Sequence, residues 1–81
     1  MQKSKMKELI KRFDELDLRG IYTIKSIYYC GEHIIEIKEC DAGKHHIYIH
    51  PDIVQLVNKN RLQMTVQNVG DGDDYMRIII I

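Results

Sequence analysis

The amino-acid sequence predicts a small α+β protein with the element order α-β-β-β-α-β-β. Apolar residues near the start of the chain recur at helical spacing, whereas residues 21–50 are rich in isoleucine and tyrosine, which favour strands. Turn-forming residues divide the apolar stretches at Gly31, at residues 41–44 and at residues 70–74. Because the chain has 81 residues, we expect it to form one domain, residues 1–81, with a small core.

The first element is a predicted helix over residues 4–18. Ser4 is a suitable N-cap, and Gly20 suits the position just beyond the C-terminal end. The apolar residues fall at i, i+3, i+4, i+7 and i+10, so they form one stripe: Met6, Leu9, Ile10, Phe13 and Leu16. The pattern therefore predicts a helix that packs with one face against the rest of the protein.

Three antiparallel strands are predicted next, at residues 21–30, 33–40 and 45–50. Gly31 and Glu32 form a two-residue loop that begins with glycine, which favours a type II′ turn. Residues 41–44 carry aspartate first and glycine third, which suits a type I turn followed by a left-handed residue. Tight turns at both joints indicate a three-stranded meander.

The first turn sets a register in which Cys30 lies opposite His33 and Tyr28 opposite Ile35. Because successive residues of a strand point to opposite faces, one face of this hairpin collects Tyr22, Ile24, Ser26, Tyr28, Ile35 and Ile37. Apolar residues also occur on the other face, so neither face is cleanly polar. We expect either a slip in the register or partial cover on both faces.

A short helix is predicted at Pro51–Lys59, because proline suits the first turn and Asp52 favours the N-terminal end. Asn60 is a suitable C-terminal stop. The order of the first five elements resembles that of a double-stranded-RNA-binding domain, which would imply basic residues at the start of this helix. Pro51 and Asp52 stand there instead, so we assign no family.

The last two strands, residues 61–69 and 75–81, are predicted to form a hairpin with Val69 opposite Tyr75. One face of this hairpin then carries Met64, Val66, Met76, Ile78 and Ile80. Ile79 and Ile81 point the other way, so the final strand is apolar on both faces. Such a strand is either interior to a sheet covered on both sides or part of an interface, and we expect a homodimer or partner interface here.

Composition and charge exclude several classes of protein. Lysine and arginine number 12, as do aspartate and glutamate, so the net charge is zero with neutral histidine, which argues against a general polyanion binder. No apolar run follows Met1, and no stretch approaches the length of a transmembrane helix. We therefore expect a cytoplasmic protein with two reduced cysteines and no membrane partner.

Cys30, His33 and His50 are the candidate metal ligands. The predicted register places all three at the same end of one face, and thiolate and imidazole suit zinc. The spacing C-x-x-H lacks a matching second pair, however, and the alternative is that Cys30 is a small buried apolar residue. A small metal-binding protein is therefore the third interpretation, and we expect no cofactor.

The motifs of common enzymes do not occur in this sequence. There is no glycine-rich phosphate loop, no serine elbow and no carboxylate dyad. Cys30 and His33 would still need a third group to orient the histidine and a site to stabilise an oxyanion. We therefore expect a protein that is not an enzyme.

Aromatic and basic residues suggest two binding roles. A stacking surface for single-stranded nucleic acid is one, and its candidate residues are Lys25, Tyr29, Lys38 and His45. A protein interface is the other, with candidates Tyr29, Tyr75, Arg77, Ile79 and Ile81. By elimination, the sequence favours a non-enzymatic accessory or inhibitor protein that binds another protein, as phage and plasmid inhibitors of host defence do. A nucleic-acid-binding module is the second interpretation.

Overall fold

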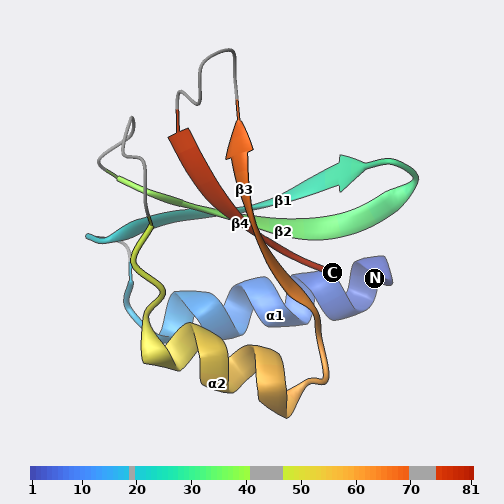
Figure 1. The fold of residues 1–81 in the computed structure, drawn as a ribbon. Coiled ribbons are helices and arrows are strands. Elements are labelled where there is room, and N and C mark those ends of the chain that lie inside the picture. The colour runs from blue at the N-terminus through green and yellow to red at the C-terminus, as the bar shows by residue number, and fades with distance from the viewer. Residues whose placement is uncertain (19, 41–46, 70–74) are drawn as a thin grey trace.

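The computed structural model describes residues 1–18, 20–40, 47–69 and 75–81. Its elements are helix α1 (Lys3–Glu15), strands β1 (Tyr22–Tyr29) and β2 (Glu32–Glu39), helix α2 (Pro51–Lys59), and strands β3 (Met64–Val69) and β4 (Tyr75–Ile80). The predicted α+β class is confirmed. The strands form two hairpins in place of the predicted meander and hairpin (Figure 1).

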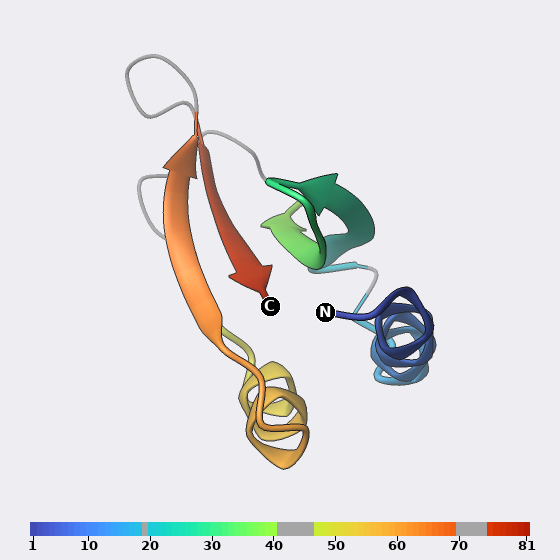
Figure 2. The same cartoon turned by 90° about the vertical axis from the view of Figure 1, so that its right-hand side faces the viewer.

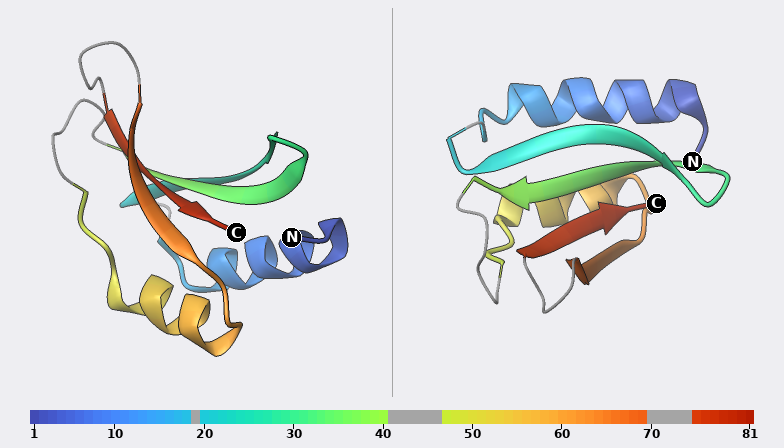
Figure 3. Two further views of the ribbon diagram at one scale, coloured as in Figure 1. Left: turned by 45° about the vertical axis from the view of Figure 1, so that its right-hand side comes forward. Right: turned by 90° about the horizontal axis from the view of Figure 1, so that it is seen from above.

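The four strands form one antiparallel sheet in the order β1-β2-β4-β3. The last strand of the chain, β4, is therefore interior, with β2 on one side and β3 on the other. Both helices lie against the same face of the sheet (Figures 2 and 3). We call the opposite side the helix-free face; its residues include Lys25, Ile27, Tyr29, Ile34, Glu36, Lys38, Gln67, Arg77, Ile79 and Ile81.

The predicted third strand at residues 45–50 is wrong where the structure describes it. Residues 47–50 contain no strand, and His45 lies outside the described residues, as does the predicted turn at 41–44. The place beside β2 is taken by β4, with Ile37 opposite Ile78 and Ile35 opposite Ile80. The isoleucine-rich strand β4 buries more apolar surface in the interior of the sheet than residues 47–50 could, which explains why β4 pairs with β2.

The turn between β1 and β2 lies one residue earlier than predicted. Tyr29 pairs with Glu32, so the two-residue loop is Cys30 and Gly31. Both have positive φ, 51° and 81°, which makes a type I′ turn rather than the predicted type II′. Tyr28, rather than Cys30, now lies opposite His33. The register differs by two residues, which leaves every side chain on its predicted face.

Helix α1 ends before the predicted boundary. Leu16 is its C-cap, and the next residue, Asp17, has φ 55°, the left-handed conformation that the sequence assigned to Gly20. Aspartate tolerates this conformation better than most residues. At the other end Gln2 is the N-cap and makes no side-chain capping bond, so the prediction of Ser4 as cap is wrong.

The prediction of helix α2 and of the final hairpin is confirmed, although β3 begins at Met64 rather than at residue 61 and β4 ends at Ile80 rather than at residue 81. Helix α2 spans Pro51–Lys59 as predicted, and His50 caps it by accepting the Asp52 N–H on Nδ1 at 3.1 Å. Strands β3 and β4 pair with Val69 opposite Tyr75. The predicted loop at 70–74 lies outside the described residues.

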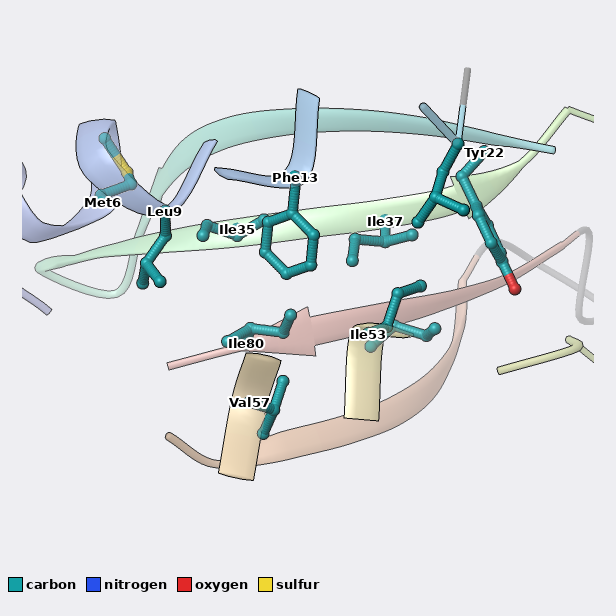
Figure 4. Close-up of a cluster of buried hydrophobic side chains, with 11 residues drawn as sticks. Met6, Leu9, Phe13, Tyr22, Ile35, Ile37, Ile53, Val57 and Ile80 are labelled. Atoms are coloured by element: carbon teal, nitrogen blue, oxygen red, sulfur yellow. The ribbon is translucent and has the colours of Figure 1, made fainter. Parts of the chain in front are cut away.

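The hydrophobic core lies between the two helices and the sheet (Figure 4). Its buried members are Met6, Leu9, Phe13, Leu18, Tyr22, Ile35, Ile37, Ile53, Val57, Ile78 and Ile80. Each fully buried isoleucine contributes roughly 1.5–3 kcal/mol. The central strands β2 and β4 supply four of these side chains, so the core depends on the pairing between the two hairpins.

Candidate functional site

The helix-free face is unusual because apolar side chains are buried on it without a covering helix. Ile34 and Ile79 are 2% and 3% exposed, although both helices lie on the other side of the sheet (Figure 3). This arrangement leaves a sheet surface with an apolar floor and a polar, partly aromatic rim.

A hollow opens on this face where the tip of the β1–β2 hairpin meets the end of β4. It is lined by Tyr29, Cys30, Glu32, Ile34, Gln67, Arg77, Ile79 and Ile81. Its volume is about 160 Å³. Pockets for drug-sized ligands measure about 300–1,000 Å³, whereas a cavity of about 150 Å³ accepts a benzene ring. The hollow therefore fits one large apolar side chain better than a whole small molecule.

An ion pair lies beside the hollow. The residue Glu36 as a whole is 3% exposed, and its carboxylate binds the Arg77 guanidinium through Oε2. Arg77 also donates through Nε and Nη2 to Gln67 Oε1, at 3.3 and 3.2 Å. The Tyr29 ring centroid is 6.0 Å from Arg77 Cζ, at the limit of a cation–π contact. These contacts hold Arg77 in one position on the wall of the hollow.

The second carboxylate oxygen of Glu36 is less well satisfied. Lys25 Nζ lies 3.4 Å from Oε1, close enough for an ion pair. Oε1 is buried and accepts no hydrogen bond. Lys25 is opposite Glu36 in the β1–β2 register, and about half of its side chain is exposed. The carboxylate is thus neutralised mainly by Arg77, while Lys25 reaches it from the solvent side.

The residues predicted as a protein interface come together, with two qualifications. Tyr29, Arg77, Ile79 and Ile81 line the same hollow. Tyr75 pairs with Val69 at the start of β4, and its side chain lies outside the described part of the chain. Ile79 is buried in the floor of the hollow, at 3% exposed, whereas Ile81, at 40% exposed, is accessible.

Of the residues predicted to contact nucleic acid, three lie on the helix-free face. Lys25, Tyr29 and Lys38 belong to β1 and β2 and share that face. Lys25 is paired with Glu36, which reduces its value as a phosphate contact. His45 lies outside the described residues.

The predicted metal ligands are not brought together. Cys30 is an exposed turn residue, the His33 ring packs 4.9 Å from the Tyr28 ring, and His50 uses Nδ1 to cap α2. Across the described residues, no group of three or more histidine, cysteine, aspartate or glutamate side chains could hold a metal ion. The three side chains stay apart because the turn lies one residue earlier than predicted and residues 47–50 form no strand.

Two important site residues, Glu36 and Gln67, were missed by the sequence analysis. A signal for Glu36 exists, since it is a single charge flanked by Ile35 and Ile37 in an isoleucine-rich strand. The predicted alternation places it on the same face as Lys25. Gln67 carries no comparable signal, because its role depends on the pairing of β3 with β4 opposite Arg77.

Within the described residues, no helix is long and apolar enough to cross a membrane. Comparison of the chain with known protein families, curated proteins and solved structures found no match in any of the three.

Proposed function

We propose that this protein is a non-enzymatic binding module that acts as an accessory or inhibitor protein and contacts another protein through its helix-free face. The observation that carries the proposal is the hollow of about 160 Å³ on a sheet face that neither helix covers. Its apolar floor and ring-sized volume suit the insertion of one apolar side chain from a partner.

The rim of the hollow has the composition of a protein interface. Tyrosine and arginine are enriched in such interfaces, and Tyr29 and Arg77 stand side by side here. Arg77 is held by Glu36 and Gln67, so little side-chain entropy is lost when a partner contacts it. A rigidly held arginine beside an apolar hollow is therefore a suitable contact point for a partner protein.

A nucleic-acid role has weaker support. Lys25 and Lys38 lie on the same face, but the buried Glu36 carboxylate forms ion pairs with Lys25 and Arg77 on that face. A negative charge in that position lowers the potential that would attract phosphates. Binding of single-stranded nucleic acid is therefore the second candidate function, and the experiment must distinguish it from binding of a protein.

The test places a charge at the hollow and compares it with the same charge elsewhere. Ile81→Lys changes an accessible wall residue, whereas the control Gln55→Lys adds the same charge on the exposed side of α2. Both proteins and the wild type are used as bait in lysate of the source cell, with chemical cross-linking and with or without nuclease. We expect a specific protein partner that survives nuclease, is lost with Ile81→Lys and is retained with Gln55→Lys.

Two results would contradict the proposal. Retention of the partner by Ile81→Lys would place the contact elsewhere on the molecule. Loss of all captured material after nuclease would favour the nucleic-acid alternative. Circular dichroism of each variant must first match the wild type, since Ile81 also forms backbone hydrogen bonds with Gln63.

A further inference from the structure

Strand β3 forms one margin of the sheet, and a row of its backbone groups has no hydrogen-bond partner among the described residues. Gln63 and Ile81 exchange hydrogen bonds in both directions, at 3.1 and 3.0 Å, which fixes the hydrogen-bonding pattern of the β3–β4 ladder. Bonded and non-bonded pairs alternate along such a ladder. The N–H and C=O groups of Met64, Val66 and Asn68 therefore point away from β4, and no described residue forms a hydrogen bond with them.

Within the part of the chain that the structure describes, this strand lacks the features by which proteins protect an edge. Its sequence, MTVQNV, contains no charge, proline or glycine, and its register with β4 is continuous, without a bulge. The opposite edge strand, β1, carries Lys25 at its middle, and α1 runs along its outer side (Figures 2 and 3). Strand β3 has neither a lysine in its sequence nor α1 beside it. At its centre Val66 is 38% exposed.

We propose that β3 pairs antiparallel with β3 of a second copy of this chain, about a two-fold axis at Val66. The three residues with unpaired groups are symmetric about Val66, so this register satisfies all of them in both copies. Met64 then lies opposite Asn68 of the second copy, and Thr65 lies opposite Gln67 of the second copy. At the axis, the Val66 residues of the two copies lie opposite each other. No like charges meet, because the strand has none.

The dimer joins two four-stranded sheets into one eight-stranded sheet with all helices on one side. The two helix-free faces then form a continuous surface. Gln67 lines the hollow, and Thr65 of the second copy lies directly opposite Gln67, so each copy extends the surface around the other's hollow. The inference uses the edge of the sheet and does not rest on the proposed function, which would stand for a monomer as well.

Analytical ultracentrifugation over a concentration series tests the dimer. Contact limited to one strand from each copy implies weak association, so the wild type is examined up to about 1 mM. Val66→Lys places two lysines opposite each other at the axis, and we expect the dissociation constant to rise at least about tenfold. Val66→Thr, which keeps the size, neutrality and strand preference of the residue, is the matched control and should dimerise.

A charge-reversal mixture separates dimerisation from a loss of folding. Val66→Glu alone should be monomeric, as should Val66→Lys alone, whereas an equimolar mixture of the two should form a heterodimer. A wild type that is monomeric at about 1 mM overturns the inference, as does a Val66→Lys protein that associates like the wild type. Species larger than a dimer, or a mixture that stays monomeric when both variants are folded, overturn it too.

Discussion

Glu36 and Arg77 form the most enclosed ion pair of the described residues, on a sheet face that has no helix over it. Their side chains are 4% and 14% exposed. Taking charges out of water is costly, and the mutual attraction offsets that cost only while both partners are present. The main effect of the pair is therefore to hold Arg77 in position, and its net contribution to the free energy of unfolding is small. Loss of one partner is destabilising, because it leaves the other charge buried and unpaired.

We expect Glu36→Ala to lower the free energy of unfolding by about 3–5 kcal/mol, because Arg77 is left without its carboxylate. Urea denaturation at neutral pH measures the change. The matched control is Glu8→Ala, which removes the exposed pair of Glu8 with Arg12 in α1, where the groups lie 3.0 Å apart. That change should cost no more than about 0.5 kcal/mol.

Replacing both partners provides a second check on this pair. The double variant Glu36→Leu with Arg77→Met removes both charges and keeps most of the volume. It should be clearly more stable than Glu36→Ala, since no buried charge remains unpaired. If Glu36→Ala and Glu8→Ala have equal effects, the carboxylate of Glu36 is not enclosed as described.

Among the elements, the β1–β2 turn shows how local chemistry determines the register. A type I′ turn requires positive φ at both central positions, and asparagine followed by glycine meets this need best. Cys30 occupies the first position with φ 51°, which is unfavourable for a cysteine. The register that follows from this turn pairs Ile27 with Ile34, Tyr28 with His33 and Tyr29 with Glu32. These cross-strand contacts offset the unfavourable conformation of Cys30.

Two substitutions in this turn should have opposite effects. Cys30→Asn should raise the free energy of unfolding by about 0.5–1 kcal/mol, because asparagine tolerates the left-handed conformation. Gly31→Ala should lower it by about 1–2 kcal/mol. Space is not the cause, since a Cβ at Gly31 would have no neighbour within 4 Å. Thermal melts under reducing conditions measure both, and an unchanged Gly31→Ala protein would mean that Gly31 does not hold positive φ in solution.

The sequence predicts elements and faces better than it predicts which strands become neighbours. Helix α2 and the β3–β4 register follow from local signals, a proline at the first turn and a short polar loop. The faces of β1 and β2 also follow, because alternation survives a slip of two residues. The pairing of β2 with β4 joins residues about forty positions apart, and no local pattern specifies it.

The candidate site was predictable only in part for the same reason. Tyr29, Arg77 and Ile81 could be proposed from their residue types and from the apolar final strand. Their meeting around one hollow depends on β4 lying beside β2, which the predicted meander excluded. The predicted cluster of Cys30 with His33 and His50 depended on that meander and is lost with it.

At the scale of the whole molecule, Tyr22 connects the first hairpin to the segment that leads into α2. Its hydroxyl donates to the Tyr48 carbonyl and accepts the His50 N–H at 3.1 Å. The ring belongs to the buried core. Burial is the main cause that raises the pKa of the Tyr22 hydroxyl, and the nearby charges of Glu39 and Tyr48 add to it, whereas the bond from His50 opposes them. The folded protein therefore favours the neutral phenol.

The last prediction concerns stability at alkaline pH. Because the pKa of Tyr22 is raised in the folded state, its contribution is complete below the unfolded pKa of about 10 and decreases as pH rises through the folded value. Tyr22→Phe keeps the ring but leaves the Tyr48 carbonyl and the His50 N–H without this partner. At pH 7 it should therefore lower the free energy of unfolding by about 0.5–1.5 kcal/mol. Urea denaturation of both proteins from pH 7 to pH 11 should show a difference that is constant up to about pH 10 and then narrows. A difference that widens above pH 10 would mean that the folded state favours the ionised phenol, in which case the hydroxyl is not the buried link between the two halves of the fold.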